Sequence, residues 1–174
     1  MLAGFIRRYC LPLLLLVALV ITLVVPVQAA DDTDALRTVP FDRSTEKVYT
    51  RAELNEGRRL FNRTCGQCHL AGQTYTNPDV SLSLEALTYA TPPRDTVVSI
   101  IDYLNEPTAY DGFESLLEYH PNTQLTSEFP KMKFIDNRDM ELMAAHILNQ
   151  AKVIPGWGGS KSEAHDIRNT DLLP

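Results

Sequence analysis

Apolar side chains recur at helical spacing in several short stretches of this chain, and prolines and polar turns separate those stretches. The longest stretch begins after Asn137, a residue that can cap a helix, and it presents one continuous apolar face. That face consists of Met140, Met143, Ala144, Ile147, Leu148 and Ala151. The pattern predicts an amphipathic helix in the last third of the chain.

A second helix is predicted to open at Thr50, because Thr50 and Glu53 have the spacing of a capping box. The residues close to its apolar face are Leu54, Gly57, Leu60 and Phe61. Gly57 would cost about 1 kcal/mol in an exposed helix. It therefore indicates either the close approach of another backbone or simple tolerance of a glycine.

Shorter apolar groups lie between these two helices. Pro92-Pro93 is predicted to start a helix that Glu106-Pro107 stops. Its apolar positions are Val97, Val98, Ile101 and Leu104. Leu82, Leu84 and Leu87 indicate a short helix or loop that lines an apolar pocket, and Leu116 and Leu117 indicate a short helical stretch that ends at His120. The predicted class is all-α.

The two ends of the chain lack helical periodicity. Within residues 30–49, Val39-Pro40-Phe41 and Lys47-Val48-Tyr49 could pair as a small hairpin or form an extended lead-in. Residues 158–174 are polar and are predicted to be a mobile tail. These limits leave residues 50–157 as one main domain.

Residues 1–29 have the pattern of a secretory signal peptide. Arg7 and Arg8 precede an apolar run over 11–25, and Val27-Gln28-Ala29 resembles a small-residue cleavage site. The alternative is a single transmembrane anchor, but the run is shorter than the roughly 20 residues that a spanning helix needs. We therefore predict export of the protein and removal of this segment.

The whole chain of 174 residues has a formal charge of −6. Removal of Arg7 and Arg8 leaves 14 basic against 22 acidic residues, which is a formal charge of −8. The remaining length suits a single domain. An acidic balance makes nucleic acid an unfavourable partner.

The segment Cys65-Gly66-Gln67-Cys68-His69 has the CxxCH pattern of covalent haem attachment. Two thiols three positions apart can add to the two vinyl groups of one haem, and the adjacent imidazole can take the proximal position on the iron. We therefore predict one covalently bound haem c, attached through Cys65 and Cys68 and ligated by His69. Haem of this type is attached after export, so the pattern and the signal peptide support each other and indicate a periplasm or a thylakoid lumen.

The same pattern has three simpler interpretations: a disulfide, a thioredoxin-like pair and half of a zinc site. A zinc site needs a second pair of ligands, and Cys10, the remaining cysteine, lies in the predicted signal peptide. A thioredoxin-like pair would follow a strand of a βαβ unit, which the pattern of this chain does not predict.

The sixth ligand of the iron decides what the haem can do. His146 lies on an apolar helix face and His165 in the polar tail, so neither is favoured as a ligand. His120, 51 residues after His69 and followed by Pro121, and Met132, which follows Phe129-Pro130-Lys131, are equally good candidates on spacing alone. A methionine ligand raises the reduction potential, whereas a second imidazole stabilises the ferric state and lowers the potential.

Beyond CxxCH, an ordered series of short motifs covers roughly residues 38–160. The series is Thr76-Asn77-Pro78, Ala90-Thr91-Pro92-Pro93-Arg94-Asp95, Asp102-Tyr103, Asn105, Pro107-Thr108, Tyr110-Asp111-Gly112, His120-Pro121, Phe129-Pro130-Lys131-Met132, Ala145-His146-Ile147-Leu148 and Trp157-Gly158-Gly159. The chain thereby resembles the cytochrome c-550 family, the extrinsic low-potential c-type cytochromes of photosystem II.

The resemblance implies a class I-like monohaem cytochrome c fold with a small N-terminal hairpin. It implies that His120 is the sixth ligand and that Met132 is a packing residue near the haem. It also implies a peripheral subunit on the lumenal side of the photosynthetic membrane. Such a subunit contacts photosystem II core subunits and other extrinsic proteins, shields the manganese-calcium cluster, and helps to retain calcium and chloride.

Two segments depart from the family pattern. The extension over 160–174 is longer and lacks Tyr and Phe, and residues 31–49 match loosely. A haem protein of this kind could have one of three functions: a stabilising subunit of the oxygen-evolving complex, a diffusible electron carrier in the lumen or periplasm, or a haem enzyme such as a peroxidase. The resemblance favours the first. Two imidazole ligands would leave no open position on the iron, so no enzyme activity is expected.

Overall fold

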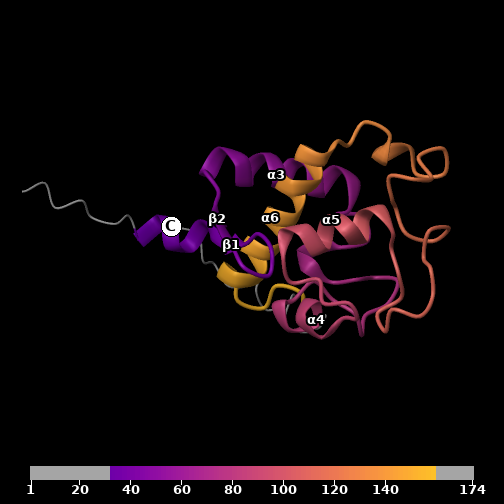
Figure 1. The fold of residues 1–174 in the computed structure, drawn as a ribbon, viewed down its shortest axis with the longest axis horizontal. Helices are drawn as coiled ribbons and strands as arrows, with labels where there is room; N and C mark the ends of the chain where they lie inside the picture. Colours follow the sequence, from indigo (N-terminus) through magenta and orange to yellow (C-terminus); the bar gives the residue numbers. More distant parts are fainter. Residues whose placement is uncertain (1–31, 160–174) are drawn as a thin grey trace, which may run out of the picture. The chain divides into compact units, whose positions relative to one another are not determined.

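The computed structural model describes residues 32–159, and it is mostly helical with one small antiparallel hairpin (Figure 1). The elements in chain order are α2 (Asp32–Arg37), β1 (Thr38–Pro40), β2 (Glu46–Val48), α3 (Arg51–Thr64), the 3₁₀ turn η1 (Leu70–Gly72), α4 (Leu84–Tyr89), α5 (Val97–Asn105), the 3₁₀ turn η2 (Pro130–Met132) and α6 (Asn137–Val153). The predicted signal peptide and residues 160–174 of the predicted tail lie outside the described residues. No helix within the described range is both long and apolar enough to cross a membrane.

The core is built where α3 and α5 pack on α6 (Figure 1). The predicted apolar face of α6 is buried except for Ala151, which is partly exposed, and Met143 and Ala144 are completely enclosed. Gly57 lies at the crossing of α3 and α6, where a Cβ atom would collide with the backbone carbonyl of Leu142. The close backbone approach that Gly57 indicated is therefore confirmed.

Local capping accounts for where the main helices begin. Thr50 and Glu53 form the predicted capping box of α3, each side chain bonding the other's backbone N–H. The start of α5 was predicted at Pro92-Pro93, which is wrong. The helix begins at Val97 because Thr96 and Ser99 form a second capping box.

The hairpin occupies the predicted N-terminal segment, with Val39 opposite Lys47 in the β1–β2 ladder. Tyr49, directly after β2, is fully buried, and its hydroxyl donates to a Glu141 carboxylate oxygen of α6 at 2.9 Å. Lys47 forms an ion pair with the same carboxylate at 2.7 Å. These contacts fasten the hairpin to the core helix.

Three local details differ from the sequence-based expectations. Helix α2 was not predicted. It is attached to α6 through Asn149, whose side-chain amide donates to the Leu36 carbonyl at 2.6 Å. The segment with Leu116 and Leu117 forms turns instead of a helix. Gly158, the first residue of the predicted mobile tail, is buried and its N–H donates to the Ala71 carbonyl at 2.9 Å.

Candidate functional site

A cavity of about 560 Å³ lies among the end of α3, the loop after it, α4, α5 and the 116–121 turns. Apolar side chains dominate its lining, and Leu82, Leu87 and Ile100 are among them. The predicted apolar pocket around Leu82 and Leu87 is therefore present. The volume falls within the range of about 300–1,000 Å³ that is usual for cofactor sites.

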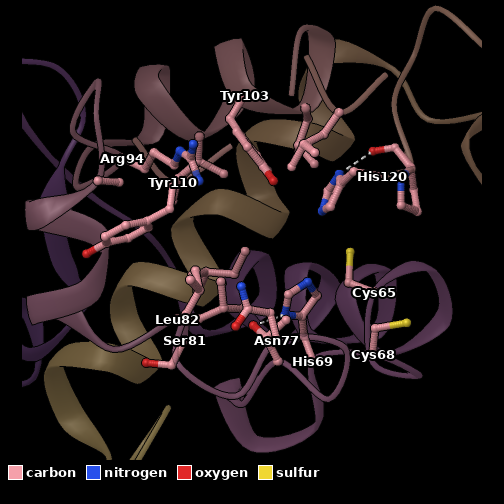
Figure 2. A pocket seen from close by; sticks show the side chains of 18 of the residues that line it. Cys65, Cys68, His69, Asn77, Ser81, Leu82, Arg94, Tyr103, Tyr110 and His120 are labelled. Carbon is pink, nitrogen blue, oxygen red and sulfur yellow. Dashed lines mark hydrogen bonds between the residues drawn. The ribbon is translucent and has the colours of Figure 1, made fainter. Parts of the chain in front are cut away.

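Cys65 and Cys68 stand together at one end of this cavity (Figure 2). Cys65 ends α3, and its N–H donates to the Phe61 carbonyl at 2.7 Å. The chain then turns, and the N–H groups of Cys68 and His69 both donate to the Cys65 carbonyl at 3.0 Å. Both cysteines are free thiols, and burial raises the pKa of the Cys65 thiol. The two sulfurs are thus available at a single edge of the cavity.

The first candidate ligand, His69, is held by the loop that follows the cysteines. Its Nδ1 lies 3.1 Å from the Thr74 hydroxyl, which leaves Nε2 as the ring nitrogen without a protein partner. Burial lowers the pKa of His69, which favours the neutral imidazole that a metal ion requires.

The second candidate ligand, His120, is held in a defined tautomer. Its Nδ1 is 2.9 Å from the Pro121 carbonyl oxygen. A carbonyl can only accept, so Nδ1 carries the proton and Nε2 keeps a free lone pair. Burial and the nearby His69 lower the pKa of His120 to about 4.

The side chain of Asn122, which is fully buried, holds the turn that carries His120. The Asn122 amide donates to the carbonyls of Leu117 at 2.8 Å and His120 at 2.9 Å. A buried, fully bonded side chain of this kind prevents the turn from relaxing, so His120 does not need a helix to hold it in place.

The two imidazoles face each other across the cavity, with ring centroids 6.2 Å apart (Figure 2). Two metal–imidazole bonds of about 2 Å, with about 1 Å from each nitrogen to its ring centre, require roughly 6 Å between the centroids. The separation therefore suits one metal ion between the two rings. With paired thiols at one edge and apolar walls, the residues fit a covalently attached haem.

Met132, the competing ligand candidate, is also buried and also lines the cavity. Both Met132 and His120 line the cavity, so this position does not decide which of them is the ligand. The two opposed imidazole rings favour His120. His146 is buried on α6 between Phe61 and Trp157, with centroid distances of 5.5 and 6.1 Å, and it does not line the cavity. His165 lies outside the described residues.

No group of three or more His, Cys, Asp and Glu side chains between residues 32 and 159 is arranged to hold a metal ion by itself. A zinc site would need such a group. The cysteine pair thus lacks the additional ligands of the zinc alternative.

Tyr103 and Arg94 belong to the site, although sequence reasoning noted them only as members of motifs. The Tyr103 and His120 rings meet edge-on, with centroids 4.9 Å apart, and the guanidinium carbon of Arg94 lies 4.1 Å from the Tyr103 ring centroid. Helical spacing could have indicated Tyr103, because it places this residue on the same face of α5 as Ile100 and Leu104.

Comparisons with known proteins identify the family of this chain. Residues 29–164 match the family model described as the cytochrome c-550 domain. The chain is 55% identical over 140 residues to photosystem II extrinsic protein V of Synechococcus sp. (strain JA-2-3B'a(2-13)), covering 80% of this chain and 76% of that one. It is 45% identical over 135 residues to the protein of the same name from Phaeodactylum tricornutum, covering 76% and 83%.

Two solved structures share the fold. The crystal structure of cytochrome c549 matches with a TM-score of 0.70 and 43% identity, covering 72% of this chain and 98% of that one. The PsbV2 cytochrome of Thermosynechococcus elongatus matches with a TM-score of 0.60 and 39% identity, covering 70% and 87%. The predicted helical cytochrome c fold with a small hairpin is confirmed.

Proposed function

The chain belongs to the cytochrome c-550 family, and from this we propose that it is an extrinsic haem subunit of photosystem II. The relatives described above carry the name photosystem II extrinsic protein V. The family consists of electron-transfer or structural subunits, and its members are not enzymes. The proposed location is the lumenal side of the photosynthetic membrane, reached through cleavage of the signal peptide over 1–29.

We propose that Cys65 and Cys68 hold one haem c through thioether bonds and that His69 and His120 are its axial ligands. The observation that carries this assignment is the 6.2 Å separation of two opposed imidazoles, each with Nδ1 already engaged by Thr74 or Pro121. Such a haem exchanges one electron between its ferric and ferrous states, at a potential that the second imidazole lowers.

The residues around the two imidazoles keep this site closed. The carbonyl of Pro121 accepts from Nδ1 of His120, and the Tyr103 ring packs edge-on against the same imidazole. With both axial positions taken by nitrogen ligands, no position remains for peroxide. A closed site of this kind serves electron storage or structural stability better than substrate binding.

The proposed role at the complex is to shield the manganese-calcium cluster and to help retain calcium and chloride. This role rests on family membership, and the closed haem site is compatible with it. A haem held through two covalent bonds and two ligands would form a rigid centre, around which the protein keeps one shape while docked on core subunits and other extrinsic proteins.

Isolation and rebinding test the proposal. Photosystem II membranes from the source organism should contain the protein, and high salt should release it together with part of the oxygen-evolving activity. Adding the purified holoprotein back should restore oxygen evolution in medium low in calcium and chloride, whereas bovine serum albumin should not. Recovery of the cytochrome only in the soluble lumenal fraction would contradict the proposal and would favour a diffusible electron carrier.

A further inference from the structure

Arg94 is a buried cation in the wall of the cavity. Only 8% of its surface is exposed, and it lies in the loop between α4 and α5. Among residues 32–159, no Asp or Glu carboxylate forms an ion pair with it. A buried guanidinium without an anionic partner is unusual, because removal of a charge from water is costly unless another charge compensates it.

The hydrogen bonds between Arg94 and the protein all come from one terminal nitrogen of the guanidinium, Nη2. Nη2 donates to the carbonyls of Thr108 at 2.9 Å and Ala109 at 2.8 Å, and it also lies 3.4 Å from the Thr108 hydroxyl. The guanidinium carbon lies 4.1 Å from the centroid of the Tyr103 ring. Nε and Nη1 form no hydrogen bond with the described part of the chain, so the N–H groups on these two nitrogens remain available as donors, each pointing in its own direction.

These contacts offset only part of the cost of burying the charge. Carbonyl dipoles and an aromatic face attract a cation, with a typical cation–π contribution of about 1–2 kcal/mol when the pair is desolvated. Burial lowers the pKa of Arg94, because desolvation disfavours the charged guanidinium. An anionic oxygen that accepts from one of the remaining N–H groups would complete the compensation.

The position of Arg94 within the cavity indicates which anion this is. Arg94 and Tyr110 stand at one end, and Cys65 and Cys68 stand at the opposite end (Figure 2). In haem, the two vinyl groups are on adjacent pyrrole rings, and the two propionates are on the other two rings. Attachment of the vinyl edge to Cys65 and Cys68 therefore directs the propionates toward the end that holds Arg94.

We propose that Arg94 binds a propionate carboxylate of the haem through one of its free guanidinium N–H groups; this rests on the proposed haem attachment at Cys65 and Cys68. Arg94 is then a binding residue for the cofactor as well as a brace for the 108–109 backbone. Its positive charge also stabilises the ferrous haem relative to the ferric haem, since the ferrous form carries one positive charge fewer. Arg94 thus offsets part of the lowering of the potential that the second imidazole causes.

The test compares three holoproteins with the unsubstituted one: Arg94→Gln, Arg94→Lys and the control Arg43→Gln. The control removes the same charge from an exposed guanidinium that bonds Asp95 and the Pro93 carbonyl, beside Arg94 but outside the cavity. Resonance Raman spectra report the hydrogen bonding of the propionates through their bending vibration, and redox titration gives the potential.

Arg94→Gln should move one propionate bending band to lower frequency. At a fixed solution potential it should also raise the ferric-to-ferrous ratio about tenfold. That change corresponds to a reduction potential lower by about 59 mV for one electron. Arg94→Lys should keep most of the potential, and Arg43→Gln should change neither quantity. An unchanged propionate band in Arg94→Gln, or equal shifts in Arg94→Gln and Arg43→Gln, would overturn the proposal.

If Arg94→Gln does not fold, the Raman spectrum of the unsubstituted holoprotein still tests the proposal. At least one of its propionate bands should lie at the hydrogen-bonded, high-frequency position, and two bands at the free position would refute the Arg94 contact. The proposed function fails in a different way, through the absence of a c-type haem with bis-imidazole spectra. A normal spectrum of that kind with an insensitive propionate band contradicts the Arg94 assignment alone.

Discussion

Gly57 of α3 lies directly against the backbone carbonyl of Leu142 in α6, so that the two helices touch without any side chain between them. This contact brings the end of α3, and with it Cys65, to a fixed position relative to the core helix. The haem site therefore depends on a helix crossing that contains no haem ligand.

Replacing Gly57 by alanine should destabilise the holoprotein by at least about 2 kcal/mol, because the methyl group overlaps backbone that cannot rotate away. Urea unfolding followed by circular dichroism measures the change. Asn55→Ala is the matched control, since Asn55 is exposed on the same helix, and it should lose no stability. A Gly57→Ala variant as stable as the unsubstituted protein would contradict the close contact.

Replacing His120 by methionine should raise the reduction potential by on the order of 0.1 V or more, because a thioether favours the ferrous state. It should also produce the sulfur-to-iron charge-transfer band at the red end of the ferric spectrum. Met132→Leu is the control and should keep the bis-imidazole spectrum of the unsubstituted protein. If the unsubstituted protein already shows the sulfur band, Met132 is the ligand and the assignment of His120 is wrong.

Replacing Cys65 or Cys68 singly by alanine should leave a haem held by one thioether bond, which the absorption of its pyridine adduct reports. Replacing both should give a chain without covalent haem. That chain should lose cooperative unfolding, since the cavity is about 560 Å³ and the haem would fill it. Recovery of a compact, cooperatively unfolding chain without haem would show that the porphyrin is not required for the core.

His146 should make the protein less stable in mild acid. Burial and the neighbouring Arg58 lower the pKa of His146 from 6.5 to about 4, so the folded protein keeps this imidazole neutral where the unfolded chain protonates it. Its stabilising contribution is complete above about pH 6.5, declines as the pH falls toward about 4, and amounts to roughly 3 kcal/mol.

The matched variant for this prediction is His146→Gln, which keeps a polar side chain of similar size that does not titrate. The difference in unfolding free energy between the two proteins should shrink between pH 7.5 and pH 4.5. Measuring this difference, instead of the pH dependence of one protein, cancels the contributions of the carboxylates. A difference that stays constant over this range would mean that the folded protein protonates His146 as readily as the unfolded chain does.

Features set by neighbouring residues could be predicted from the sequence. Thr50 and Glu53 cap α3 as expected, because a capping box needs only residues three positions apart. The start of α5 was misplaced because Pro92-Pro93 and the pair Thr96 and Ser99 both fit a helix start, and only the formed capping box distinguishes them. Helix α2 was missed because it is stabilised by bonds from Asn149 and Lys152, more than 110 positions away along the chain.

By itself, the sequence predicted the chemistry of attachment: CxxCH supplies two thiols and one imidazole, and their spacing is a covalent property of the chain. Only the tertiary structure brought His120 to 6.2 Å from His69 and turned its Nδ1 toward Pro121. Spacing alone had left His120 and Met132 equal, because a loop of 51 residues can reach many positions around the cavity. The packing favours one of these positions for His120, since the buried Asn122 bonds the His120 carbonyl and the Tyr103 ring packs edge-on against the imidazole.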